Sequence, residues 1–344
     1  MFPRPPLFIN DDLAIDQYTN RSIRRRKWLM EHCHGPIVLL APEYGPNQMY
    51  AWANCFCPVY QDSYILYLTG INQLGIAIIL DPVKNEHHIF LPKYNSKTIF
   101  WDGDYFSYGD KRSHDFLSQL GFTHIHAKNQ LDQIISQYSQ NSIWHLLIQK
   151  VQKKYRRDDQ FLLKQRLSRR FKSNFKFKNI EGLSWQQRFS HDATAINCAK
   201  QGAKKTEIAF RRLLTQSPFN SETQLAGQLI GELLKETCFG LSFSPIVARD
   251  KNAATLHYTA NSEQCKNNSL ILLDFGIRWQ SMCTDVSRTI PSQGRYTDLQ
   301  KRLMAIVLST LSVTQQKLKA GVTFKELNDF AWQHLETTLQ QEFL

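Results

Sequence analysis

The sequence lacks the features that would place it among membrane, secreted or repeat proteins. No apolar run reaches the ~18 residues that a membrane-spanning helix needs. The first eight residues show no charged segment followed by an apolar one, so a secretory signal is not expected. No internal repeat or low-complexity tract occurs. We therefore expect a soluble, cytoplasmic protein without a membrane partner.

Cysteine is scarce and irregularly spaced. The chain has 7 cysteines, an odd number, and free thiols are typical of a reducing compartment. Cys55 and Cys57 are too close together for a usual zinc pair, and no second pair accompanies them. We expect packed or free thiols, which agrees with a cytoplasmic location.

Acidic residues are outnumbered by basic ones, and the excess is local. The net charge is +12. The stretch from Lys150 to Lys178 contains twelve basic residues and two acidic ones, a local balance of +10. Aromatic residues are interleaved there, so binding of nucleic acid through phosphates and stacked bases is one interpretation. We favour the other, a solvated helix and a linker between two domains, and do not expect a nucleic-acid partner.

Helix and strand patterns alternate along a chain whose 344 residues suffice for two domains. We predict strands at 36–40, 64–68, 75–80, 88–91, 123–126, 143–148, 246–248 and 255–258. We predict helices at 13–31, 113–120, 193–214, 221–237, 297–319 and 323–339. His124 and His126 share one strand face. Because no carboxylate or cysteine is near them in the sequence, we expect packed histidines rather than a metal pair.

Two carboxylates, Asp274 and Asp285, lie on a predicted hairpin. Residues 270–273 form an apolar strand, and 282–290 form its return partner. The acids are 285 − 274 = 11 residues apart, so a turn at 279–280 would place them directly opposite, with Cβ atoms about 5 Å apart. Like charges held so close favour a hard divalent cation such as Mn²⁺ between them.

The two acids also allow two other interpretations. A strand aspartate near a turn is most often simply solvated. Asp274-Phe275-Gly276 also matches the magnesium-binding triplet of protein kinases. However, no Gly-x-Gly-x-x-Gly loop precedes the triplet and no His-Arg-Asp segment occurs, which excludes a kinase.

The wider context of the acids carries a family pattern. The matching residues are Asn252, Ala253, Leu256, His257, Tyr258, Leu273, Asp274, Gly276, Asp285, Arg288, Thr289, Pro291 and Gly294. The spacing from His257 to Asp274 is 274 − 257 = 17 residues. This pattern resembles the catalytic domain of the Xaa-Pro aminopeptidases (aminopeptidase P), which are pita-bread metallopeptidases. Asp250 departs from the pattern, because the family usually has glycine there.

The amino-terminal half agrees with the same family. Residues 20–27, 62–70 and 99–103 look like segments of the domain that precedes the catalytic domain in aminopeptidase P. The resemblance implies an α/β (α+β) fold. Residues 1–175 would form a creatinase/aminopeptidase-P-like αβ domain, with a basic linker near 150–178. Residues 176–344 would form an incomplete pita-bread catalytic domain.

The resemblance also implies an activity and roles for residues. The family releases the amino-terminal residue from Xaa-Pro peptides by metal-activated water, with two metals, here expected as Mn²⁺, and family members form homo-oligomers. Asp274 would chelate one metal and Asp285 would bridge both. His257 would hydrogen-bond the substrate, and Tyr258 and Asn252 would shape the pocket for a proline-containing peptide.

The family's remaining ligands, a His and two Glu, are not found in the 344 − 285 = 59 residues after Asp285. Their single histidine, His334, lies in a predicted helix and is expected to be an ordinary helix residue. We therefore expect a chain truncated relative to its family, whose own activity is doubtful. A non-catalytic peptide-binding or partner relative, and a prolidase- or creatinase-like enzyme, are the alternatives.

Overall fold

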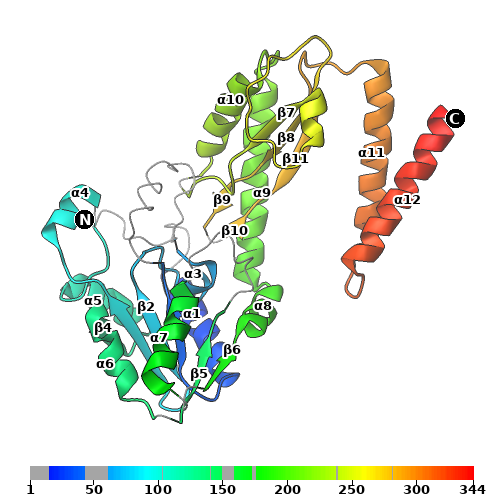
Figure 1. The fold of residues 1–344 in the computed structure, drawn as a ribbon. Helices are drawn as coiled ribbons and strands as arrows, with labels where there is room; N and C mark the ends of the chain where they lie inside the picture. The colour runs from blue at the N-terminus through cyan, green and yellow to red at the C-terminus, as the bar shows by residue number, and fades with distance from the viewer. Residues whose placement is uncertain are drawn as a thin grey trace. The chain divides into compact units, whose positions relative to one another are not determined.

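The structure, a computed structural model, describes residues 15–42, 61–102, 104–139, 141–148, 159–172, 176–237, 239–280 and 282–344 (Figure 1). The chain forms two units. The first comprises Met1–Lys205, Thr237–Ser242 and Ile277–Thr284. The second comprises Thr206–Glu236, Phe243–Gly276 and Asp285–Leu344. Helices and strands mix in both, which confirms the predicted α/β class.

A mixed six-stranded sheet forms the centre of the first unit, in the order β4-β3-β2-β1-β5-β6. Its strands are β1 (Ile37–Leu40), β2 (Ala77–Asp81), β3 (Glu86–Leu91), β4 (His124–Ala127), β5 (Ile143–Leu146) and β6 (Lys176–Asn179). β2 is antiparallel to β1 and β3, whereas β4 is parallel to β3 and β5 is parallel to β1. β4 and β6 are the edge strands.

Apolar residues cover both faces of this sheet, because successive side chains of a strand point to opposite sides. One core contains residues of α1 (Ile15–Glu31), α3 (Ser63–Thr69) and α5 (Lys111–Gln119), and Leu183 of α8 (Glu181–Phe189) packs against it. The other core contains residues of α6 (Leu131–Ser136) and α7 (Asp159–Phe171). The short α4 (Ser96–Asp102) and η2 (Lys128–Gln130) complete the unit.

The strand predicted at 64–68 is wrong, because these residues form helix α3. The carboxylate of Asp62 accepts hydrogen bonds from the backbone N–H groups of Tyr64 and Ile65 and so caps the first turn. Gly70, at φ +73°, ends the helix in the left-handed conformation that glycine tolerates best. Two local capping signals therefore outweigh the apolar, aromatic composition that suggested a strand.

The basic stretch contributes regular structure to the first unit where the structure describes it. Residues 159–171 form α7, whose Leu163 and Leu167 are buried, and β6 pairs in parallel with β5. Residues 149–158 and 173–175, and also Cys55 and Cys57, lie outside the described residues.

A three-stranded antiparallel sheet, in the order β11-β8-β7, forms the second unit with its helices. The strands are β7 (Ile246–Arg249), β8 (Leu270–Phe275) and β11 (Val286–Pro291). The helices are α9 (Ala193–Leu214), which begins in the first unit, α10 (Glu222–Leu234), α11 (Asp298–Lys317) and α12 (Phe324–Phe343). The ring of Phe210 on α9 stacks on Phe275 of β8, with centroids 5.3 Å apart.

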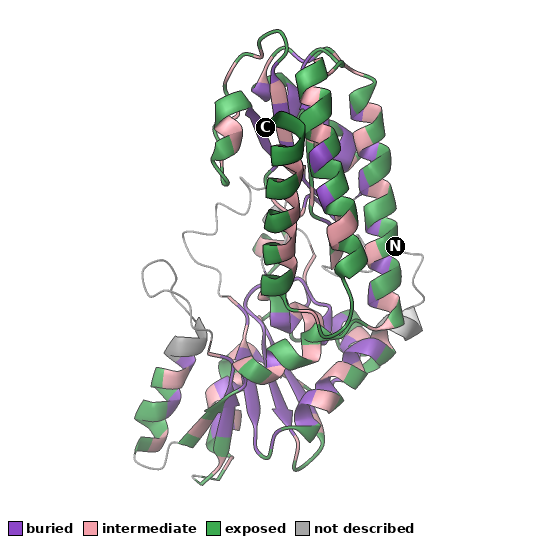
Figure 2. Cartoon of the chain, turned by 90° about the vertical axis from the view of Figure 1, so that its right-hand side faces the viewer, coloured by how far each residue is buried: buried purple, intermediate pink, exposed green. Residues whose placement is uncertain are grey.

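Local capping explains where the helices of this unit begin. Ser221 accepts from the N–H of Gln224 at the start of α10, and Thr297 and Thr323 form capping boxes on α11 and α12. Exposed residues run along the helices at the C-terminal end of the chain (Figure 2). The exposed side chains of α11 include apolar ones, among them Leu308, which is 58% exposed. None of the helices in the described part of the chain has the length and hydropathy required to cross a bilayer.

The predicted strand at 255–258 is also wrong. These residues follow the 3-10 helix η4 (Asp250–Ala254) and form a turn, in which the N–H of Tyr258 donates to the carbonyl of Thr255 at 3.2 Å. The hydroxyl of Tyr258 donates to the carboxylate of Glu222 and so ties this turn to the start of α10.

Candidate metal centre

The two acids lie on the hairpin of β8 and β11, but not directly opposite each other. Asp274 faces Ser287 across the ladder, and its carboxylate accepts from the Ser287 hydroxyl at 3.1 Å. The hairpin continues as β9 (Arg278–Trp279) and β10 (Met282–Cys283), with Trp279 opposite Met282. The expected register, with a turn centred at 279–280, was therefore wrong by one residue at the turn.

This shift moves Asp285 two residues from the position opposite Asp274. Positions two apart on a strand point to the same side of the sheet, so the acids become diagonal neighbours on one face. Asp274 is half-buried near the end of β8, whereas Asp285 is exposed just before β11. The face predicted for the two acids is thus kept, although the predicted register is not.

The surroundings of Asp274 disfavour its charged form. Burial raises the pKa of Asp274, and the negative charge of Asp285 raises this pKa further. The hydroxyl of Ser287 and the positive charge of His257 oppose the rise without cancelling it. His257 itself is exposed, on the turn that follows η4. A carboxylate pair of this kind offers hard oxygen ligands to a divalent cation, so the residues present fit such an ion.

A buried carboxylate, Glu222, organises the predicted substrate residues. Its side chain has no exposed surface, and one oxygen accepts from the Arg249 N–H (2.8 Å) and the Asn252 amide (2.9 Å). The other oxygen accepts from the Tyr258 hydroxyl (2.7 Å) and the Glu263 N–H (2.9 Å). Burial alone would raise the pKa of Glu222, but these four hydrogen bonds hold the pKa below its ordinary value.

Sequence reasoning missed Glu222, although one signal was available. Glu222 is the first residue of α10, directly after the Ser221 cap, where a carboxylate interacts favourably with the helix dipole. Its partners lie 27 to 41 residues further along the chain, so their convergence could not be seen in the sequence. The side chains of Asn252 and Tyr258 are therefore held by hydrogen bonds to the buried carboxylate of Glu222.

Asp250, which stands where the family usually has glycine, takes the glycine-like conformation. Its φ is +45°, in the left-handed region. The carboxylate compensates by accepting from the Ser269 hydroxyl (2.8 Å), the Leu270 N–H (3.1 Å) and the Arg249 guanidinium (3.0 Å). Asp250 thus adopts a left-handed conformation and links η4 to the start of β8.

Two further residues can be placed. Arg288, on β11, donates from its guanidinium to the backbone carbonyl of Ser287 at 2.7 Å. His334 lies on α12, with its Nδ1 3.0 Å from the hydroxyl of Thr310 on α11. His334 therefore lies in a helix, as predicted, and contacts the neighbouring helix α11.

Comparison with known proteins decides the family. Residues 197–343 match the profile of metallopeptidase family M24, and residues 22–145 match the aminopeptidase P amino-terminal domain. The chain belongs to the pita-bread metallopeptidases of family M24, with the domain order of aminopeptidase P. The predicted fold, an aminopeptidase-P-like αβ domain followed by a pita-bread domain, is confirmed.

Several relatives match about four fifths of the chain. Intermediate cleaving peptidase 55 of Arabidopsis thaliana, a mitochondrial protein, is 25% identical over 275 residues, which cover 79% of this chain and 53% of that protein. A Xaa-Pro aminopeptidase of Haemophilus influenzae is 23% identical over 80% of this chain and 62% of its own length. The chain thus spans between half and two thirds of the length of these two relatives.

Solved structures agree on the fold. Proline aminopeptidase P II from Yersinia pestis matches with a TM-score of 0.78 and 20% identity, covering 94% of this chain and 74% of that one. Aminopeptidase P from Escherichia coli with the inhibitor Pro-Leu matches with a TM-score of 0.78 and 21% identity, covering 94% and 73%. At this level of identity the likeness concerns the fold.

Proposed function

We propose that this chain provides part of a metal-dependent aminopeptidase that releases the amino-terminal residue from Xaa-Pro peptides. The observation that carries the proposal is the pair Asp274 and Asp285, which share one face of a hairpin. The negative charge of Asp285 helps to raise the pKa of Asp274. The order of domains and the names of the matched relatives support the reaction class and the proline-containing substrate.

In this proposal Asp274 and Asp285 hold divalent metal, for which two Mn²⁺ ions are the expected occupants. Bound there, the metal would polarise the scissile carbonyl and lower the pKa of water. The other ligands expected for the family, a His and two Glu, are not found among these 344 residues. Hydrolysis is therefore proposed for the protein in which those ligands complete the site.

The chain's own residues would position the substrate. His257, exposed beside the acids, would donate a hydrogen bond near the scissile peptide. Asn252 and Tyr258 would form the pocket wall, and the bonds of both residues to Glu222 fix their orientation before a substrate arrives. Cytoplasmic residence and homo-oligomerisation remain part of the proposal, supported by the sequence and the family resemblance respectively.

Binding of Mn²⁺ tests the carboxylate pair directly. Titration of Mn²⁺ into the purified chain, followed by electron paramagnetic resonance, should show bound ion that Asp274→Asn removes. The matched control is Asp298→Asn, because Asp298 is 97% exposed and pairs only with nearby Lys301 among the contacts the structure shows for it. Unchanged Mn²⁺ binding in Asp274→Asn would refute the role of the pair.

Hydrolysis tests the reaction. Release of the first residue from an Arg-Pro-Pro peptide, abolished by Asp274→Asn, would support an aminopeptidase. Peptide binding without hydrolysis, in a protein that carries all the family ligands, would instead favour the non-catalytic alternative.

A further inference from the structure

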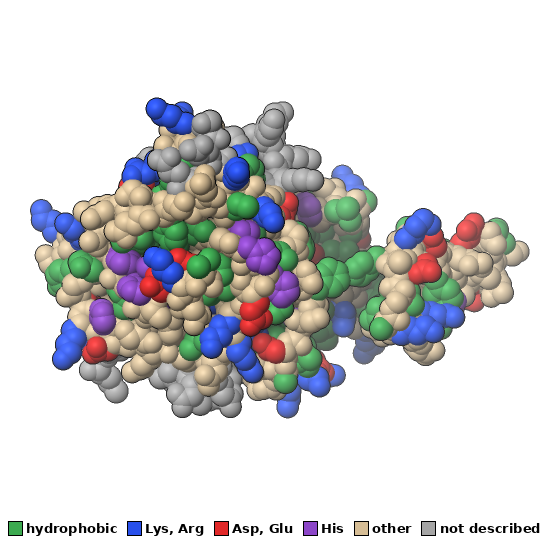
Figure 3. Space-filling model, turned by 90° about the horizontal axis from the view of Figure 1, so that it is seen from below, with side chains coloured by type: hydrophobic (Ala, Val, Ile, Leu, Met, Phe, Trp, Pro, Cys, Tyr) green, Lys and Arg blue, Asp and Glu red, His purple; other side chains and the backbone are tan. Residues whose placement is uncertain are grey.

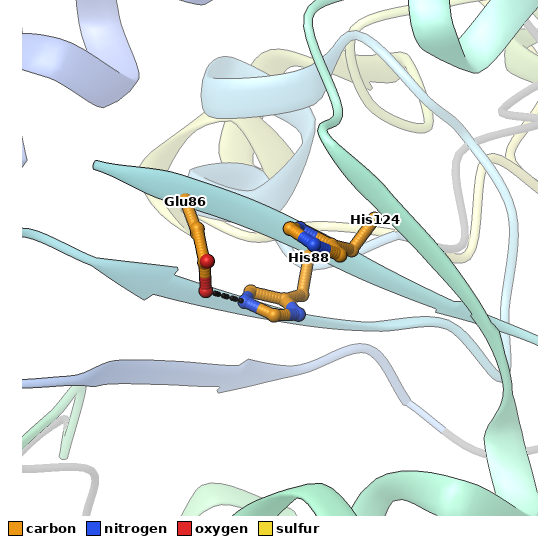
Figure 4. A group of neighbouring side chains, drawn as sticks. All are labelled: Glu86, His88 and His124. Carbon is orange, nitrogen blue, oxygen red and sulfur yellow. Dashed lines mark hydrogen bonds and ion pairs between the residues drawn. The ribbon is translucent and has the colours of Figure 1, made fainter. Parts of the chain in front are cut away.

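A second group of metal-binding residue types lies in the first unit, on the sheet rather than on the β8–β11 hairpin. On β3, Glu86 and His88 are two positions apart and so point to the same face of the sheet. On the parallel edge strand β4, His124 lies opposite His88, and His126 lies opposite Phe90. Register thus gathers one carboxylate and three imidazoles on one face, and Figure 4 shows three of them together.

This juxtaposition removes the reason for which the sequence disfavoured a metal site at His124. No carboxylate is near His124 along the chain, but strand pairing brings Glu86 to it from 38 residues away. Ligand atoms of Glu86, His88 and His124 all lie within 4.8 Å of one another. Several histidines are visible, among charged side chains, on the surface shown in Figure 3.

The contacts within the group assign different roles to the two nitrogens of His88. Its Nε2 lies 3.1 Å from the Glu86 carboxylate, and its Nδ1 lies 3.0 Å from Nε2 of His126. The ring of His124 stacks on that of His88, with centroids 4.6 Å apart and planes 15° apart. A metal ligand typically uses one imidazole nitrogen for the ion and gives the other to a hydrogen-bond partner, and His88 has both neighbours in place.

We propose that Glu86, His88 and His124 bind a Zn²⁺ ion that fastens the edge strand β4 to β3. His88 coordinates through Nε2, on the side of Glu86, while its Nδ1–H donates to His126. His126 is thus a positioning residue, and water fills the fourth position of the tetrahedron. Two imidazoles and one carboxylate select Zn²⁺ over Mn²⁺, so this site differs in metal preference from the carboxylate pair.

The geometry requires a small rearrangement. Ligand atoms around a tetrahedral Zn²⁺ lie about 3.3 Å apart, given Zn–N bonds of about 2.0–2.1 Å, so separations of up to 4.8 Å must shorten. His124 must also rotate out of the stack, because an ion lies in the plane of each ring that binds it. His124 is exposed and can turn, whereas His88 is buried and stays as the fixed ligand.

The protonation state of the cluster suits metal binding. Burial lowers the pKa of His88, and burial with the charges of His88 and His124 lowers the pKa of His126 to about 4. Both shifts favour the neutral imidazole, which offers a lone pair to a metal or to a hydrogen-bond donor.

The test uses the full chain without a polyhistidine tag, in a background of Asp274→Asn and Asp285→Asn that removes the carboxylate pair. Titration with Co²⁺, a spectroscopic substitute for Zn²⁺, should give a visible absorption band that saturates at one equivalent and is displaced by Zn²⁺. His124→Ala should abolish the band or weaken binding at least tenfold. His126→Ala should weaken binding by about 10- to 100-fold, as for other residues that orient a ligand.

A matched control and a second measurement keep the proposal falsifiable. His114→Ala replaces an exposed histidine on α5 and should leave Co²⁺ binding unchanged. Zn²⁺ should also raise the thermal midpoint of the background protein and slow amide exchange in 124–127, and neither effect should survive His124→Ala. Absence of stoichiometric binding, or equal binding in His124→Ala and His114→Ala, would overturn the proposal. Neither result would affect the Mn²⁺ test of the carboxylate pair.

Discussion

Replacement of Glu222 by glutamine tests whether this buried carboxylate organises the site. Each carboxylate oxygen accepts two hydrogen bonds. One oxygen accepts from Arg249 and Asn252, and the other accepts from Tyr258 and Glu263. Glutamine has nearly the same shape, but its NH₂ group must face the two donors of one side. The change therefore removes acceptor capacity while leaving the packing almost unchanged.

The size of the effect follows from these four bonds. The hydroxyl of Tyr258, or the amide of Asn252, can turn and accept from the new NH₂ group. The backbone N–H on the same side cannot, and an unsatisfied buried donor costs about 1–3 kcal/mol. The remaining bonds lose their charge assistance, which adds about 1 kcal/mol. We expect Glu222→Gln to lower the free energy of unfolding of the second unit by about 2–4 kcal/mol.

Urea unfolding followed by circular dichroism measures the loss, and hydrogen exchange localises it to residues 246–263. The matched control is Glu207→Gln, on α9 of the same unit. Glu207 pairs at 2.8 Å with Arg211, and the two side chains are 56% and 74% exposed, so the control should cost no more than about 0.5 kcal/mol.

The loss should depend on pH with a defined sign. Because the pKa of Glu222 is lowered in the folded protein, its contribution is fully present above the ordinary value of 4.5 and disappears as pH falls through the lower folded value. The difference between wild type and Glu222→Gln should therefore be constant near pH 7 and shrink at acid pH. If Glu222→Gln and Glu207→Gln unfold at the same urea concentration, Glu222 does not organise the site.

Three further changes have defined outcomes. In metal-free protein, Asp274→Asn should raise stability at pH 7, because the raised pKa of Asp274 means that its charged form destabilises the fold as pH rises. Solvent screens the exposed Asp285, so the gain should be only about 0.2–0.5 kcal/mol; a urea midpoint unchanged in chelator would contradict this. Among variants of Asp250, stability should fall in the order Asp250→Asn, Asp250→Gly, Asp250→Ala. Glycine and alanine both lose the side-chain hydrogen bonds, and alanine is also strained at a φ of +45°; equal urea midpoints for Asp250→Gly and Asp250→Ala would disprove the strain. Gly70→Ala, at φ +73°, should cost about 1–2 kcal/mol, and an unchanged thermal midpoint would argue against the left-handed helix end.

The sequence predicted elements best where local signals decide them. The bounds of α9 coincide with the predicted 193–214. The helices predicted to start at Ser221 and Thr297 are α10 and α11, which these two residues cap. The prediction failed at 64–68, where composition favoured a strand but Asp62 and Gly70 cap a helix. It also failed at 255–258, where a distant partner, Glu222, holds a turn.

The sequence predicted that Asp274 and Asp285 share a face from strand periodicity together with an assumed turn. The face is kept because the register moved by two residues, whereas a slip of one residue would have put the acids on opposite faces. Only the tertiary structure decided that Ser287, not Asp285, lies opposite Asp274. The same holds for the four donors around Glu222 and for the meeting of Glu86, His88 and His124. The sequence carries periodicity and capping because both act over a few residues, whereas strand order and register depend on the packing of the whole sheet.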